Sequence, residues 1–155
     1  MNNAEKTIQN FKEYLKSTKH NCAAQTIAGS YNGFFIEVLT PDKYHIEVSV
    51  DEALSLVTLK AYSVKVNAAD LLKQAQIKAV ELSDRIKAGA YGISSTTGEL
   101  YYKISTSILE NPADGEVLAQ LEELSIRMLS SVEDQFLKTD ILRFTKQSES
   151  KTKEK

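Results

Sequence analysis

Residues Ala90–Leu109, AYGISSTTGELYYKISTSIL, decide the fold of this chain. Polar and apolar residues alternate on both sides of Thr97-Gly98, which is typical of two antiparallel strands joined by a tight turn. Long patterns with apolar residues three and four positions apart, typical of amphipathic helices, lie before and after this hairpin. A hairpin placed between two helices favours an α+β domain over alternating βαβ units.

The sequence before the hairpin predicts a helix and then strands. Apolar residues at helical spacing predict a first helix over Ala4–Leu15. The apolar residues from Ser17 to Gly29 follow neither helical nor strand spacing. We expect a connection there, with at most a short strand around Gln25–Ala28. Three strands follow, at Gly33–Leu39, Tyr44–Val50 and Leu54–Val66.

Turns between these strands are indicated by composition. Thr40–Lys43 contains a proline at a position that β-turns favour, and Asp51-Glu52 reverses the chain after the second strand. In the third strand the apolar residues occupy odd-numbered positions from Val57 to Ala61 and even-numbered positions after it. A bulge or a bend near Ala61 would explain this change.

Two more helices flank the hairpin. The second is predicted to begin at an N-cap, Asn67, and to end at Gly89. Its expected core stripe is Leu71, Ala75, Ala79, Leu82 and Ile86. The third helix follows Asn111–Gly115, and its expected stripe is Leu118, Leu121, Leu124, Met128, Val132 and Phe136.

The predicted order is therefore α-β-β-β-α-β-β-α, an α+β fold in which an antiparallel sheet carries its helices mainly on one face. We predict a single domain over residues 1–145. Residues 146–155 are charged and lack apolar side chains, so we predict a disordered tail there.

Composition excludes several classes of function. One cysteine and two histidines offer neither an internal disulfide nor a spaced zinc-ligand set. The net charge is −2 and the last ten residues carry +2, so the remainder carries −4, which disfavours nucleic acid as a partner. The amino-terminal run is too polar for a signal peptide, and no stretch approaches the ~20 apolar residues of a membrane span. We expect a cytoplasmic protein without a membrane partner.

No catalytic arrangement is indicated. Neighbouring carboxylates, such as Asp51 and Glu52, diverge on a strand or a helix, and on its predicted sheet face His45 has only Glu47 as a candidate catalytic partner. No glycine-rich loop precedes a helix to hold phosphate. We therefore predict that the protein is not an enzyme and uses no metal or cofactor.

The sheet face away from the helices is the candidate binding surface. If Phe34, Ile36 and Val38 face the helices, the alternate residues of that strand face away, and apolar residues of later strands join them. The predicted partner-binding residues are Phe35, Glu37, Leu39, Leu59, Tyr101 and Lys103, with Glu37 and Lys103 at the rim. Contiguous apolar patches of this kind mark protein interfaces.

The hairpin also carries a family likeness. The pattern G-I-x-x-x-T-G-E-L-Y-Y-K at Gly92–Lys103, with the aromatic-bearing helix end Asp134–Leu137, resembles the YbjN-like family of bacterial sensory transduction regulators. The resemblance implies the fold shared with class I type III secretion chaperones, and a self-associating binding module without a catalytic centre.

Together these observations predict a non-catalytic, chaperone-like module that binds a protein partner or forms a homodimer, through the apolar sheet face or the last helix. The alternative is a small-molecule-binding domain or an unrecognised enzyme. Its pocket would lie between sheet and helices and be lined by Tyr44, Tyr62 and Tyr102.

Overall fold

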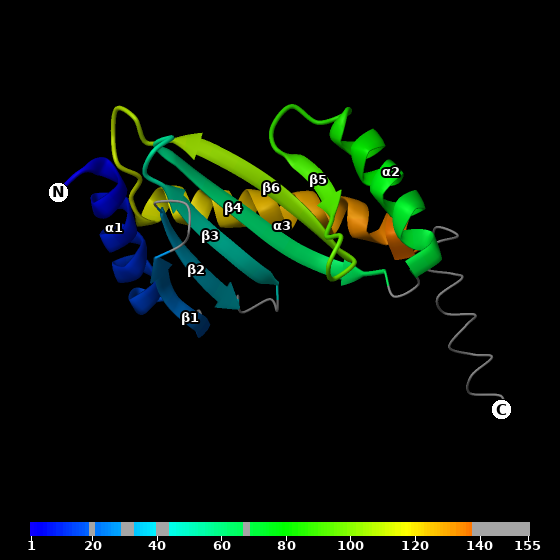
Figure 1. Ribbon diagram of the computed structural model, residues 1–155, viewed down its shortest axis with the longest axis horizontal. Helices are drawn as coiled ribbons and strands as arrows, with labels where there is room; N and C mark the ends of the chain where they lie inside the picture. The colour runs from blue at the N-terminus through cyan, green and yellow to red at the C-terminus, as the bar shows by residue number, and fades with distance from the viewer. Residues whose placement is uncertain (19–20, 29–32, 40–43, 67–68, 138–155) are drawn as a thin grey trace. The chain divides into compact units, whose positions relative to one another are not determined.

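The computed structural model describes residues 1–18, 21–28, 33–39, 44–66 and 69–137 (Figure 1). Side chains are described for residues 1–18, 44–66 and 70–136. The predicted turn at Thr40–Lys43, the predicted N-cap Asn67 and the predicted tail over 146–155 lie outside the described residues.

The described elements confirm the α+β fold class. The helices are α1 (Asn3–Ser17), α2 (Leu72–Ser83) and α3 (Gly115–Leu137), and a 3-10 turn, η1 (Ala69–Leu71), precedes α2. The strands are β1 (Asn21–Ala28), β2 (Gly33–Leu39), β3 (His45–Asp51), β4 (Leu56–Lys65), β5 (Ala90–Ile93) and β6 (Glu99–Ser107). They form a six-stranded sheet in the order β1-β2-β3-β4-β6-β5.

The chain divides into two compact units. Unit 1 contains Met1–Ala61 and Lys103–Ile126, and unit 2 contains Tyr62–Tyr102 and Arg127–Lys155. β4, β6 and α3 each contribute residues to both units. That residues 1–145 behave as a single domain stays a prediction.

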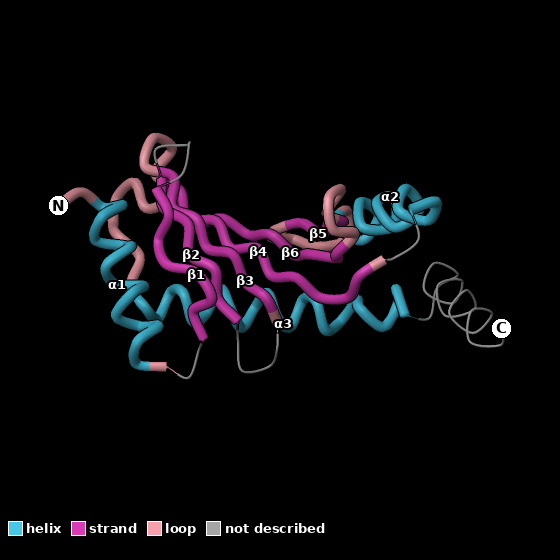
Figure 2. Tube along the Cα trace, turned by 60° about the horizontal axis from the view of Figure 1, so that its bottom comes forward, coloured by secondary structure: helices cyan, strands magenta, loops and turns pink. Residues whose placement is uncertain are grey.

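Unit 1 buries one face of its strands. α1 contacts β3, and the first half of α3 runs along the same side of the strands (Figures 1 and 2). The buried row of β3 alternates with a half-buried row, as expected for a strand with one covered face. The apolar core of this unit includes Ala4, Ile8, Phe11, Leu15, Ile46, Val48, Val50, Val57, Leu59, Ala61, Ile108, Leu118 and Leu121.

One strand is longer than predicted, because the sequence indicated a connection with at most a short strand around Gln25–Ala28. β1 covers Asn21–Ala28 and pairs antiparallel with β2. Its register shifts between Cys22 and Ala24 and again between Ala24 and Ile27. Irregular pairing of this kind breaks the period of two that identifies a strand in the sequence.

The alternation of buried and half-buried residues in β4 ends after Ala61, near the predicted bulge or bend, which stays a prediction. Ala61 is buried, and the next residue of the same row, Ser63, donates a hydrogen bond to the Glu133 carboxylate of α3. The helix-facing row therefore continues with a polar residue. The half-buried Tyr62 and Val64 belong to the other row.

The second helix is shorter than predicted, because α2 ends at Ser83 rather than at Gly89. The Ser83 hydroxyl donates to the Ala79 carbonyl at 2.8 Å and accepts the Tyr91 N–H at 2.8 Å. Arg85 N then closes a tight turn onto Leu82 O. Ser83 thus joins the end of α2 to β5, and Gly89, with φ 72°, lies in the loop between them.

The core stripe of α3 differs from the prediction at two positions. Ser125 is fully buried and donates to the Leu121 carbonyl at 2.6 Å, so its hydroxyl is satisfied within the helix. Leu124, predicted in the stripe, is 36% exposed, and Leu129 takes the buried position predicted for Met128. No helix among the described residues combines the length and the apolarity that a membrane crossing requires.

Candidate protein-binding surface

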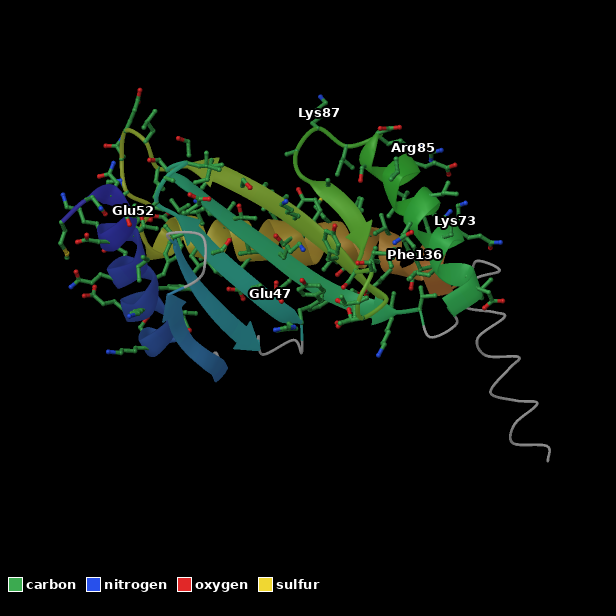
Figure 3. All side chains as sticks on the ribbon, in the orientation of Figure 1. Glu47, Glu52, Lys73, Arg85, Lys87 and Phe136 are labelled. Atoms are coloured by element: carbon green, nitrogen blue, oxygen red, sulfur yellow. The ribbon has the colours of Figure 1, made fainter. Side chains whose placement is uncertain are left out.

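The register of β2 against β3 fixes the positions of three predicted site residues. Phe35 pairs with Ser49, Glu37 with Glu47 and Leu39 with His45. Residues 45, 47 and 49 form the half-buried row of β3, and Figure 3 labels Glu47 on this strand. Positions 34, 36 and 38 pair with the buried residues Val50, Val48 and Ile46. We call positions 35, 37 and 39 the β2 row; their side chains lie outside the described residues.

Leu59 does not belong to an exposed surface, contrary to the prediction. Its side chain is 0% exposed in the core of unit 1, as is that of Val57. The row of β4 that faces away from the core is formed instead by Leu56, Thr58 and Lys60. The loop from Glu52 to Ser55 sets this register, and a shift of one residue exchanges the two faces of a strand.

Lys103 is exposed, as a rim residue must be, and the residues that follow it on the outer row of β6, Ser105 and Ser107, are polar. Ser105, two residues on, shares a hydrogen bond of 2.8 Å with Thr58 of β4. The outer face of unit 1 is therefore mostly polar over β4 and β6, with Leu56 as the apolar residue of the β4 row.

Tyr101 lies in unit 2 and has a packing role there. A Cβ built on Gly92 would lie 2.3 Å from Cζ of the Tyr101 ring, so the ring occupies the space above this glycine. The ring also contacts Tyr62, with centroids 5.9 Å apart and planes tilted by 58°. An aromatic ring that covers a strand glycine replaces its missing side chain, so Tyr101 has a packing role in unit 2, and its role in partner binding stays a prediction.

Two tyrosines of the alternative pocket, Tyr62 and Tyr102, face opposite sides of the sheet. Tyr102 is fully buried, contacts the ring of Tyr91 at a centroid distance of 5.5 Å and donates to the Ala88 carbonyl at 2.7 Å. Tyr62 contacts Tyr101, the strand neighbour of Tyr102, and neighbours on a strand point to opposite faces. Tyr44 belongs to unit 1.

Burial makes Tyr91 and Tyr102 weaker acids than an exposed tyrosine. Desolvation raises the pKa of Tyr91 and that of Tyr102 above the ordinary 10.0. The charge of an ionised Tyr91 raises the pKa of Tyr102 further, and a hydrogen bond with Ser131 lowers that of Tyr91. The Tyr91 hydroxyl donates to the Met128 carbonyl at 2.7 Å. Both hydroxyls thus act as structural donors.

The paired carboxylates have structural roles. Asp51 accepts the Leu54 N–H at 2.9 Å, and Glu52 accepts a hydrogen bond from the Asn2 side chain. The first caps a turn, and the second ties that turn to α1. Within the described ranges, no three His, Cys, Asp or Glu side chains gather as metal ligands would.

Two exposed apolar residues were not predicted from the sequence. Leu54 is 67% exposed in the loop between β3 and β4, and Leu109 is 73% exposed between β6 and α3. Leu54 follows Ala53 and Leu109 follows Ile108, so neither residue belongs to a periodic pattern that would indicate its exposure.

Comparison with known proteins gives a likeness of fold. No family model matches the chain, and no curated protein matches it in sequence. Among solved structures, a chain in the HopA1–SchA chaperone–effector complex is similar, with a TM-score of 0.51 and 10% sequence identity. The match covers 81% of this chain and 89% of that chain. The fold is thus similar to one found in a chaperone–effector complex, whereas the YbjN-like family stays a prediction.

Proposed function

We propose that this protein is a non-catalytic, chaperone-like module that binds a polypeptide, either a partner protein or a second copy of itself, through the β2 row. The observation that carries the proposal is the likeness of fold to a chain in a chaperone–effector complex, over four fifths of the sequence. That neighbour has an effector protein in its complex.

The chemistry of the β2 row supports this surface. Two large apolar residues, Phe35 and Leu39, stand on either side of Glu37 at register positions beside the half-buried row of β3. Burial of apolar area supplies most of the affinity of protein interfaces, and charges at the rim supply specificity. Lys103, separated from β2 by β3 and β4, lies about 14 Å from it and is a positive group at the other side of this face.

The last helix is the second surface for pairing of two copies. Leu124 is displaced from the core stripe by the buried Ser125 and lies 36% exposed. Leu124 lies between Glu123 and Arg127 in the sequence. An exposed leucine bordered by charged residues resembles the apolar centre and polar rim of a helix-to-helix interface.

A capture experiment with matched variants tests the proposal. The tagged full chain is returned to the cells from which it derives, and bound polypeptides are quantified for wild type, for Phe35→Asp with Leu39→Asp, and for Val80→Asp. Val80 is an exposed apolar residue on α2 and serves as the control. We expect one polypeptide that the wild type and the control retain and that the β2 variant loses. Equal recovery by all three folded proteins would refute binding through the β2 row.

Pairing of two copies is measured separately. Sedimentation velocity of the purified chain is expected to show a species of twice the 17.3 kDa mass. Leu124→Glu is expected to shift it toward monomer if the last helix forms the contact. An unchanged distribution would assign the contact to another surface.

A further inference from the structure

Three exposed apolar residues of unit 1 come from segments that hydrogen bonds hold together. We call Met1, Leu54 and Leu109 the apolar corner; they are the most exposed large apolar side chains among the described residues. Ile108 N donates to Ser55 O at 2.8 Å, which joins the residues that follow Leu54 and precede Leu109. Asn3 donates to the carbonyls of Ile108 and Leu109 at 2.9 and 3.3 Å, so the start of α1 lies against the same loop.

The backbone holds this arrangement in a defined conformation. Ser55 has φ 51°, in the left-handed region that costs a residue other than glycine roughly 1–2 kcal/mol. Figure 3 labels Glu52 beside the first turn of α1, where its carboxylate accepts the Asn2 hydrogen bond. The exposure of Leu54 and Leu109 is therefore a property of a connected surface and not of isolated loop ends.

The apolar corner has an acidic rim. Residues 1–6, 51–55 and 107–114 contain five acidic side chains and one basic side chain, Lys6. The acidic residues are Glu5, Asp51, Glu52, Glu110 and Asp114. A polypeptide that docks here gains most if it combines apolar side chains with an excess of positive charge.

One segment of the chain has that chemistry. Ile141, Leu142 and Phe144 are apolar, and residues 141–155 contain five basic and two acidic side chains. We propose that the segment 141–155 of a second copy docks on the apolar corner, with its apolar residues against Leu54 and Leu109 and its lysines toward the acidic rim.

Chain length favours a second copy as the source. α3 has 23 residues and is therefore about 35 Å long, and Figure 1 shows the β6–α3 loop at its amino-terminal end. Phe144 follows Leu137 by seven residues, which span at most about 25 Å. The apolar part of the segment is thus too short to return along its own helix. Two copies can exchange segments in a closed, two-fold symmetric pair.

Sedimentation of the full chain tests this contact. We expect reversible dimers that dissociate as salt is raised from about 50 to 500 mM, because the charges across the contact are screened. Leu54→Ser with Leu109→Ser, and separately Ile141→Ser with Phe144→Ser, should each raise the dissociation constant by roughly tenfold or more. The matched control, Val80→Ser, removes an exposed apolar side chain on α2 and should leave association unchanged.

Reversal of the charges on both sides of the contact provides a second test, because a variant that fails to fold would not regain association. Glu52→Lys with Glu110→Lys should weaken association, and Arg143→Glu with Lys146→Glu in the partner copy should restore it. A chain that stays monomeric at about 100 µM, or dimers unaffected by the corner and segment variants, would overturn the inference. The β2 variant Phe35→Asp with Leu39→Asp should leave this dimer intact, so failure here and failure of the proposed function are distinguishable.

Discussion

The backbone N–H of Ala113 donates a hydrogen bond of 3.0 Å to the hydroxyl of Thr7, a residue that is fully buried in α1. The Asn10 side chain donates to the carbonyl of the same alanine at 3.0 Å. Both polar groups of the Ala113 backbone are therefore satisfied by α1. These bonds fix the segment between β6 and α3, which also contains Leu109.

Replacing Thr7 by valine should lower the free energy of unfolding by about 1–3 kcal/mol, because a buried N–H loses its acceptor while the volume stays nearly the same. Thr7→Ser retains the acceptor and serves as the control. Urea unfolding followed by circular dichroism measures both. A Thr7→Val protein as stable as the wild type would show that this hydrogen bond contributes nothing.

Gly92→Ala should destabilise unit 2 by about 1–3 kcal/mol, because the new Cβ meets the Tyr101 ring at 2.3 Å. The ring must move, and its contact with Tyr62 is then lost. In a Tyr101→Thr background the same alanine should cost less. Thermal unfolding of the four proteins gives the coupling free energy, and equal costs in both backgrounds would contradict the packing role assigned to Tyr101.

Ser55→Gly should stabilise the chain slightly, by up to about 1 kcal/mol, because glycine adopts φ 51° without strain. The gain is limited by the larger entropy of glycine in the unfolded chain. Ser55→Val should destabilise, since a β-branched residue suits this conformation poorly. Equal stability of the glycine and valine variants would show that the turn adopts another backbone conformation.

Ionisation of the buried Tyr91 and Tyr102 at alkaline pH should unfold the protein. Burial raises the pKa of both groups above 10.0, so the folded state holds their protons more tightly than the unfolded state does. Their contribution is complete below pH 10.0 and is lost as the pH rises through the folded-state pKa values. Tyrosinate absorbance should therefore rise together with unfolding. Tyr102→Phe should reduce the loss of stability above pH 10.0, and a gradual titration without unfolding would contradict the assignment.

The sequence indicated most elements of the fold but not the faces of every strand. β3 and β6 were predictable because each has one buried and one outward row. Leu59 was assigned to the wrong face of the sheet, because the face on which a residue lies depends on the length of the preceding loop. That loop contains Ser55 in a left-handed conformation, which the residue pattern does not predict. The same holds for Ser125, whose burial depends on a hydrogen bond to its own helix.

The candidate surface was only partly predictable. The positions of Phe35, Glu37 and Leu39 follow from alternation in β2 and agree with its register against β3. The apolar corner depends on loops more than 50 residues apart that meet through backbone hydrogen bonds. Periodicity describes elements and carries no information about which loops adjoin.

Site-specific photo-crosslinking in the cells of origin tests the proposed function most directly. A photoreactive amino acid is placed at Leu39 in the full chain and, as the control, at Val80. The β2-row proposal predicts a covalent adduct with one defined polypeptide from position 39 and none from position 80, with mass spectrometry separating a foreign partner from a second copy. No adduct at position 39, or the same mixture of adducts at both positions, would contradict it.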